Sequence, residues 1–291
     1  MEKLIIEVGS TVTKVDLYDG EKVENVEEKT IWFKKHYKEN NRLNINDIEE
    51  LIKLVKEKKE EYENIYVCGT SVFRALDEES KKAFLDFFLE NTGVEFHIIS
   101  QDEETIYTVI GATKNIKQKV GVFIGGGGST EIAVCENGKI IEMANTKMGV
   151  VDVMDKFPDL SEDIATTDVE TVRSFIKEKL NLPQNKVDIL ILAGGGHLKF
   201  ALNSGINYES NTLFKDEDEP IMMSIETRKK DTQKYFKEIS LDEIRNRVSD
   251  PKWWYATRAM TAFVLEAAEN MDVKYIVPTN IPMIYGIIKE L

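Results

Sequence analysis

The sequence predicts an α/β fold made of two domains, and three observations support this prediction. Short apolar strands alternate with helical segments along most of the chain, which is typical of mixed α/β layers. The length of 291 residues is enough for two domains of ordinary size, each with its own core. Three strands also end in glycine-rich turns, which indicates several loops that converge on one ligand.

The first half begins with two strands around a turn and continues with alternating helices and strands. Residues 4–15 read as strand, turn and strand, in a hairpin that extends to about Val26. A polar segment follows, and then Ile48, Leu51 and Val55 recur at helical spacing. The expected elements after the hairpin are a helix over 45–59, a strand over 65–68, a helix around 81–91, a strand over 94–99 and a helix over 103–115.

The second half repeats this order and looks like a structural duplication of the first. Residues 206–250 are polar with few apolar anchors, so we expect surface helices or loops there. The boundary between the halves falls near residues 112–118, which predicts domains at 1–114 and 115–291. The expected elements are a hairpin over 120–145, a helix over about 168–180, a strand over 187–193, a helix over about 251–270, a strand over 275–277 and a helix over 281–290.

Composition and charge restrict the classes of partner. The net charge of −14 argues against nucleic acid or an anionic membrane, because binding either requires a basic surface. The same charge would repel a polyanionic substrate unless the site is locally positive or holds a divalent cation. No apolar run approaches the ~18 residues of a membrane span. Two cysteines, Cys68 and Cys135, read as small core residues, so we expect a reducing, cytoplasmic location. The oligomeric state stays open, a homodimer included.

The most informative segment is residues 122–131, where an apolar strand runs into four glycines and then Ser129, Thr130 and Glu131. Glycines allow backbone N–H groups to approach an anion, the hydroxyls add donors, and Glu131 can hold a cation or a water molecule. The alternative is a tight turn within a sheet, although such a turn needs only one or two glycines. The other glycine turns lie at residues 9–11 and 194–197. None of the three matches a P-loop or a dinucleotide-binding fingerprint.

Histidines give no metal-ligand spacing, so a zinc site is not expected. His197 is the one to examine, because it directly follows the third glycine turn.

Three segments together carry a resemblance to a known family. Residues 67–75 are similar to a threonine-serine-x-x-arginine segment, residues 98–105 to a serine-glycine-x-glutamate-glutamate-alanine segment, and residues 126–131 to a second phosphate loop. These are motifs of the exopolyphosphatase and guanosine pentaphosphate phosphatase (Ppx/GppA) family. The resemblance implies the two-domain actin-like ATPase fold, which is ribonuclease H-like, with the site in an interdomain cleft.

The resemblance also implies an activity and its residues. The implied reaction is hydrolysis of a terminal phosphoanhydride in inorganic polyphosphate or guanosine pentaphosphate, with release of orthophosphate. Glu104 would position or deprotonate the attacking water, and Arg74 would hold substrate phosphate. Glu7 and Glu131 would hold Mg²⁺, with Glu131 also able to bind the water. The implied substrate-binding residues are Gly9, Ser10, Thr70, Ser71, Gly126, Gly127, Gly128, Ser129 and Thr130.

Two of these residues are also compatible with purely structural roles. Arg74 is also compatible with a structural salt bridge, and Glu104 with an exposed position in an acidic helix N-terminus.

The chain departs from the family at three places. Glu7 replaces an aspartate at the end of the first strand, and Ile124 replaces the aspartate before the second loop. Residues 278–286 lack the family's arginine and glutamate. These departures keep two alternatives open: a catalytically weak regulatory protein that binds phosphate or nucleotide, and an ATP-hydrolysing activator of the same superfamily, which residues 9–14 resemble.

Overall fold

The computed structural model describes residues 2–9, 12–70, 72–194, 196–203, 208–214, 218–247, 254–279, 281 and 283–290. The chain forms two compact units, residues 1–104 and 105–291. The sequence-based domain boundary at 114/115 stays a prediction. No helix among the described residues is both long and apolar enough to cross a membrane.

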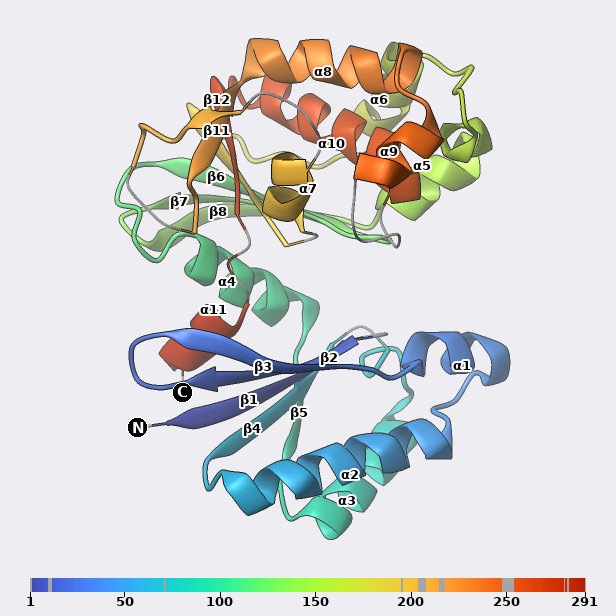
Figure 1. The fold of residues 1–291 in the computed structure, drawn as a ribbon, viewed down its shortest axis with the longest axis vertical. Coiled ribbons are helices and arrows are strands. Elements are labelled where there is room, and N and C mark those ends of the chain that lie inside the picture. Colours follow the sequence, from blue (N-terminus) through green and yellow to red (C-terminus); the bar gives the residue numbers. More distant parts are fainter. Residues whose placement is uncertain are drawn as a thin grey trace. The chain divides into compact units, whose positions relative to one another are not determined.

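The first unit is built on a five-stranded mixed sheet in the order β3-β2-β1-β4-β5 (Figure 1). The first three strands form an antiparallel meander, and β4 and β5 continue the sheet parallel to β1. The strands are β1 (Lys3–Val8), β2 (Val12–Tyr18), β3 (Val23–Thr30), β4 (Ile65–Gly69) and β5 (Phe96–Ile98).

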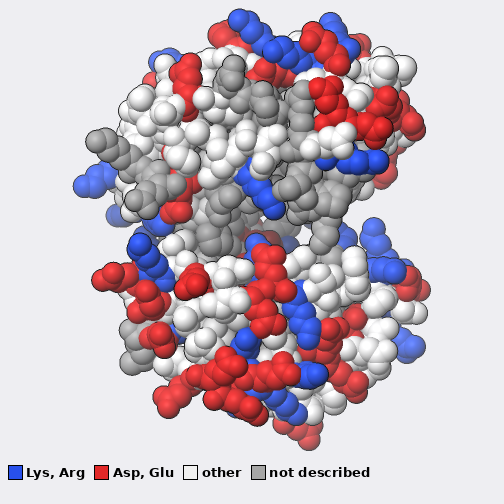
Figure 2. All heavy atoms as spheres, viewed as in Figure 1, with Lys and Arg blue, Asp and Glu red and all other residues white. Residues whose placement is uncertain are grey.

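Three helices of this unit are α1 (Phe33–Asn40), α2 (Ile45–Glu61) and α3 (Glu78–Thr92). The helix α2 begins after Asn44 and α3 after Asp77, because each of these side chains accepts a hydrogen bond from a backbone N–H of the first turn. Figure 1 shows α2 and α3 together along one face of the sheet. Their outer surfaces carry acidic side chains interspersed with lysines (Figure 2).

The core of the first unit is aromatic where α3 meets the sheet. Phe73, Phe84 and Phe88 pack around Phe96 with ring centroids 4.8–5.2 Å from it. Phe73 is fully buried in this cluster. It therefore anchors the segment that follows β4, and this segment carries Arg74.

The second unit contains a seven-stranded sheet in the order β10-β11-β12-β9-β6-β7-β8. Strands β6, β9 and β12 run parallel to one another, whereas β7 and β8 extend β6 as an antiparallel meander. The strands are β6 (Val120–Gly125), β7 (Thr130–Glu136), β8 (Lys139–Thr146), β9 (Ile189–Ala193), β10 (Glu209–Ser210), β11 (Ile221–Ser224) and β12 (Tyr275–Pro278).

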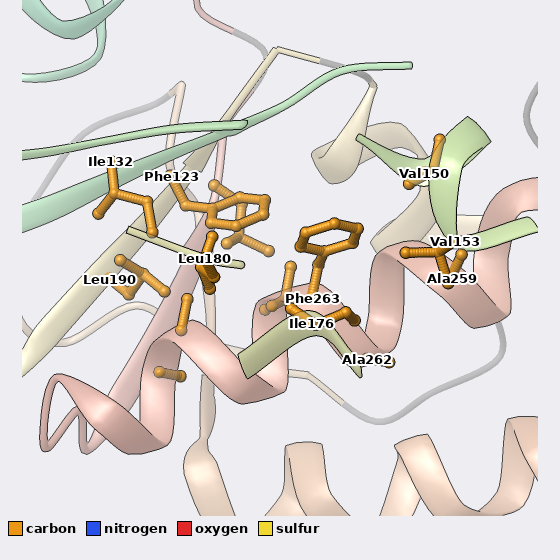
Figure 3. Packing of buried hydrophobic residues seen from close by; sticks show 14 of the residues in the cluster. Phe123, Ile132, Val150, Val153, Ile176, Leu180, Leu190, Ala259, Ala262 and Phe263 are labelled. Carbon is orange, nitrogen blue, oxygen red and sulfur yellow. The ribbon is translucent and has the colours of Figure 1, made fainter. Parts of the chain in front are cut away.

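Helix α10 (Thr257–Asn270) is buried on nearly every side and forms the centre of this unit's main core. Figure 3 shows Phe123 of β6 and Ile132 of β7 in the same cluster as Ala262 and Phe263 of α10. The other helices of the unit are α5 (Val150–Lys156), α6 (Val169–Lys177), α7 (His197–Asn203), α8 (Ile225–Lys237), α9 (Leu241–Arg247) and α11 (Ile284–Glu290), with short 3₁₀ turns at 158–161 and 254–256.

Helix α4 (Gln101–Ala112) begins in the first unit and continues into the second. Its C-terminal half, with Val109, Ala112 and the following Ile116, packs in a second core cluster with residues of β6, β7 and β9. Gly286 of α11 lies so close to the backbone of Tyr107 that a Cβ atom would be 2.2 Å from its carbonyl oxygen. Only glycine permits this close contact of α11 with α4.

Two expectations about individual segments were wrong. Residues 33–40 form the helix α1, although their polar sequence predicts only a connecting segment. Residues 206–250, expected at the surface, include two strands of the sheet and the helix α8, in which Tyr235 and Phe236 are buried. The buried status of Cys68 and Cys135 is as predicted.

Candidate functional site

The functional residues predicted in the first unit lie at the carboxyl ends of its parallel strands. The Thr70 N–H donates to the Val8 carbonyl at the end of β1 over 3.3 Å, and the Ile99 N–H after β5 donates to the Gly69 carbonyl over 2.9 Å. The ends of β1, β4 and β5 are therefore held side by side. In open α/β sheets this edge is the one that binds ligands.

Gly9 forms the turn between β1 and β2. Its N–H donates to the Val12 carbonyl over 3.0 Å, and a Cβ atom at this position would lie 2.7 Å from the same oxygen. The tight turn is therefore sufficient to explain why residue 9 is a glycine. Thr70 is buried. The predicted residues Ser10 and Ser71 lie outside the described part of the chain.

Arg74 and Glu104 form an ion pair. Nη1 of Arg74 lies 2.5 Å from Oε2 of Glu104 and also donates to the Ile99 carbonyl over 3.1 Å. The side chains are 27% and 38% exposed, so both can reach a ligand from solvent. Within the described residues Nε and Nη2 of Arg74 make no hydrogen bond, which leaves part of the guanidinium available for phosphate.

Helix α4 gives its two consecutive glutamates different partners. The Glu103 carboxylate accepts from the Ser100 N–H over 2.8 Å, while the Ser100 hydroxyl accepts from the Glu103 N–H over 3.2 Å. This reciprocal pair is a capping box, and hydrogen bonds from Ser100 lower the pKa of Glu103. Glu103 is therefore committed to starting the helix, whereas Glu104 faces Arg74.

Glu7 is the carboxyl group on β1 that the sequence assigned to metal binding. Burial raises its pKa, and the nearby Asp16 and Glu104 carboxylates add to this increase, whereas Lys14 opposes it. Lys14 is the direct cross-strand partner of Glu7 on β2. Glu7 thus lies in an acidic, partly desolvated environment close to Glu104.

In the second unit, Gly125 ends β6, and the next three glycines, Gly126, Gly127 and Gly128, lie in the loop between β6 and β7. A hydrogen bond of 2.9 Å from the Gly126 N–H to the Ser129 carbonyl closes the loop. Within the described residues, the N–H groups of Gly127 and Gly128 donate to no acceptor, and both residues are partly or fully exposed. Two free, adjacent N–H groups are donors suited to a phosphate oxygen.

The residues after the loop are held by the sheet. The Thr130 hydroxyl donates to the Met148 carbonyl over 2.9 Å, so it serves the fold and does not point a free donor at a ligand. Glu131 is buried and pairs with Ile124 across β6 and with Asn145 across β8. Ile124 packs against the second core cluster and offers no oxygen to a cation.

The third glycine turn follows β9, the strand next to β6. Its carboxyl end therefore lies beside that of β6, while convergence of the three glycine turns on one ligand stays a prediction. His197 follows this turn, but burial and the charge of Arg228 lower its pKa to about 4. The imidazole is neutral at physiological pH and supplies no positive charge for phosphate. Gly195 of the same turn lies outside the described residues.

No group of three or more His, Cys, Asp or Glu side chains comes together as a metal site in the part of the chain that the structure describes. The roles of the predicted site residues stay predictions. Residues 148–150 resemble a turn of the same family, but the sequence does not show that the segment Met148–Asp152 contacts the glycine loop directly.

Comparisons with known proteins agree with this architecture. The sequence profile of the Ppx/GppA phosphatase family matches residues 19–245. A Ppx/GppA enzyme structure from Aquifex aeolicus superposes with a TM-score of 0.78 at 19% identity, covering 100% of this chain and 99% of that chain. An exopolyphosphatase structure from Cytophaga hutchinsonii gives a TM-score of 0.73 at 11% identity, with 99% and 97% covered. No curated protein sequence matches the chain significantly.

The structural likenesses confirm the predicted α/β fold, which this chain shares over its whole length with the Ppx/GppA enzyme and exopolyphosphatase structures. The predicted interdomain cleft stays a prediction. The profile includes Arg74, Glu104 and the glycine loop, but it begins after Glu7 and Gly9.

Proposed function

This chain belongs to the Ppx/GppA phosphatase family, and from that premise we propose that it hydrolyses a terminal phosphoanhydride bond. The proposed substrates are inorganic polyphosphate and guanosine pentaphosphate, and the released product is orthophosphate. The observation that carries this proposal is the glycine loop, where the N–H groups of Gly127 and Gly128 have no acceptor among the described residues and can bind phosphate oxygens.

Each side chain has a specific part in the proposed reaction. A water molecule attacks the terminal phosphorus, and the Glu104 carboxylate takes its proton. The bond from phosphorus to the bridging oxygen breaks, and the shortened substrate keeps the electron pair. Arg74 orients Glu104 through their ion pair and offers its remaining N–H groups to the substrate. The loop N–H groups stabilise the charge on the transferred phosphoryl group.

Glu7 is the carboxyl group of the first unit that would hold a divalent cation, although no cluster of three acidic, histidine or cysteine ligands exists among the described residues. Burial and neighbouring carboxylates make the charged form of Glu7 unfavourable, and a bound Mg²⁺ would offset that cost. When bound, the ion would neutralise negative charge on the substrate's phosphate oxygens. Glu131 is the second predicted ligand, and Ile124 supplies none. We therefore expect this protein to need a higher Mg²⁺ concentration for activity than a family member that has aspartates at the positions of Glu7 and Ile124.

A second candidate function is a regulatory protein that binds phosphate compounds with little turnover. Ile124 favours it, because the family's aspartate is lost at the start of the phosphate loop. An ATP-hydrolysing activator is a third candidate, supported only by residues 9–14.

Substitution of Gly128 by alanine tests the role of the loop. A Cβ atom at Gly128 meets no atom within 4 Å, and the residue is not among the glycines with positive φ. We therefore expect an unchanged melting temperature for Gly128→Ala, with KM for polyphosphate or guanosine pentaphosphate raised about tenfold or more. A variant of unchanged stability and unchanged KM would mean that the loop does not contact the substrate.

A further inference from the structure

The glycine loop is bonded on one side to the start of helix α5. The Val150 N–H donates to the Gly126 carbonyl over 3.1 Å, and the Val151 N–H donates to the Gly127 carbonyl over 2.9 Å. Both carbonyl groups at the tip of the loop therefore face α5. The first N–H groups of α5, which have no partner within the helix, are satisfied by the loop.

Peptide geometry then determines where the loop's N–H groups point. The carbonyl of Gly126 and the N–H of Gly127 belong to one peptide unit, as do the carbonyl of Gly127 and the N–H of Gly128. No described peptide bond is cis, and in a planar trans peptide the C=O and N–H bonds point in opposite directions. Because both carbonyls face α5, both N–H groups face away from it. The start of α5 thus sets the direction of the two free donors.

The helix is itself fixed to the core of the unit. Val150 and Val153 are buried, and Figure 3 shows both in the cluster with Ala259 of α10. The segment that orients the loop is therefore held in place by packing against α10, and it does not depend on a ligand for its position.

Gly149 and Asp152 complete the connection between helix and loop. A Cβ atom at Gly149 would lie 2.4 Å from the Gly127 carbonyl carbon and 2.5 Å from the Gly126 carbonyl oxygen, so any side chain there would push the loop away. The Gly149 N–H donates to Oδ2 of Asp152 over 2.8 Å. This bond fixes the orientation of Gly149 against the loop, while the Asp152 side chain remains exposed.

We propose that Gly149 and Asp152 are positioning residues, which hold the loop so that the N–H groups of Gly127 and Gly128 face the substrate phosphate. The inference rests on the proposed function, since it takes the loop as the phosphate-binding element. It assigns to an exposed carboxylate a favourable role in binding an anion, which is the opposite of its direct electrostatic effect.

The direction in which phosphate affinity changes in an Asp152 variant distinguishes a positioning role from a direct electrostatic effect of the carboxylate. Removal of a negative charge near a phosphate site strengthens anion binding if electrostatics alone act. Loss of the hydrogen bond to Gly149 weakens anion binding if that bond orients the loop. We expect Asp152→Ala to bind inorganic phosphate about tenfold more weakly than the wild-type protein, as for one lost hydrogen bond. We expect Asp152→Asn to bind within about threefold of wild type, because the amide oxygen can still accept the bond.

Titration calorimetry with inorganic phosphate is the experiment, with Asp155→Ala as the matched control. Asp155 is an exposed carboxylate on the same helix and makes no bond to the loop. Its removal should leave phosphate affinity unchanged or slightly raise it. Gly149→Ala should abolish phosphate binding, and circular dichroism establishes whether that variant is folded.

The outcomes distinguish the inference from the proposed function. If Asp152→Ala binds phosphate as tightly as Asp155→Ala, the positioning role is wrong even when the wild-type protein is an active phosphatase. If Asp152→Ala weakens phosphate binding and Asp152→Asn restores it, the role holds even when no substrate is hydrolysed. Wild-type protein that binds no phosphate would overturn both.

Discussion

Two adjacent glutamates in α4 illustrate how position within a helix turn decides the role of a residue. Glu103 is used by the capping box with Ser100, and Glu104 is left to pair with Arg74. The sequence predicted the importance of Glu104 by resemblance alone. The structure adds that the carboxylate of its neighbour Glu103, which has the same charge, already accepts a hydrogen bond from the Ser100 N–H.

We expect Glu104→Gln to lower kcat by ~10²-fold or more, because the amide cannot accept the proton of the attacking water. The matched control is Glu103→Gln, which changes the same charge on the same turn while an amide oxygen can still cap the helix. Its kcat should stay within about twofold of wild type. Equal losses in the two variants, measured by orthophosphate release, would remove Glu104 from the mechanism.

His197 predicts a specific pH dependence of stability. Its pKa is about 4 in the folded protein, where burial and Arg228 disfavour the charged form, against the ordinary 6.5. Between these values the unfolded chain binds a proton that the folded protein does not bind. The free energy of unfolding should therefore fall as pH decreases from about 6.5 to about 4, by up to about 3 kcal/mol from this group.

Urea unfolding of the wild-type protein and of His197→Gln at pH 7, 5 and 4 measures this contribution. The loss of stability on acidification should be smaller in the variant, since glutamine does not titrate. Parallel curves for the two proteins would show that the imidazole is protonated in the folded state as readily as in the unfolded chain.

At the scale of elements, sequence patterns predicted long periodic segments well and short ones poorly. The helix α2 and the strands β6 and β9 have strong apolar patterns, and they form where expected. The segment 206–250 was misread because β11 has only four residues and α8 presents a narrow buried stripe in a highly charged sequence. Its burial comes from partners distant in sequence, such as β12 and α10, which local patterns do not reveal.

Arg258 of α10 connects three segments of the second unit. Its guanidinium donates to five backbone carbonyls, those of Tyr235, Leu160, Glu162, Asp163 and Ile239, over 2.7–3.1 Å. The side chain is 1% exposed, and burial lowers its pKa. These bonds connect α10 to the end of α8 and to the turn before α6.

We expect Arg258→Lys to lower the free energy of unfolding by about 3 kcal/mol or more. A lysine ammonium has three donors on one atom and cannot reach carbonyls on separate segments, so several stay unsatisfied. Arg245→Lys is the control, because Arg245 is an exposed residue paired with Asp242 at 3.3 Å, and its change should stay within about 0.5 kcal/mol. Chemical denaturation that gives equal values for the two variants would contradict this role.

For the whole molecule, the alternation of apolar strands and helices predicted the α/β fold class, and the glycine run located the loop between β6 and β7, whose phosphate-binding role stays a prediction. The sequence did not predict which elements hold that loop. The contact of Gly149 with the loop, and the bond of Gly149 to Asp152, depend on how β8 returns the chain beside β7, and only the three-dimensional structure shows this. The net charge of −14, with acidic side chains spread over the face in Figure 2, makes the molecule as a whole repel a polyanion.

The central claim is that this chain hydrolyses phosphoanhydride bonds with the help of a divalent cation. Orthophosphate release by purified protein from inorganic polyphosphate, guanosine pentaphosphate and ATP, across a wide range of Mg²⁺ and with Glu104→Gln as the background, tests it most directly. We predict Mg²⁺-dependent release from polyphosphate or guanosine pentaphosphate, less from ATP, and almost none from the variant. Binding of one of these compounds without release of phosphate at any Mg²⁺ concentration would contradict the claim and identify the protein as a phosphate-ligand binding protein.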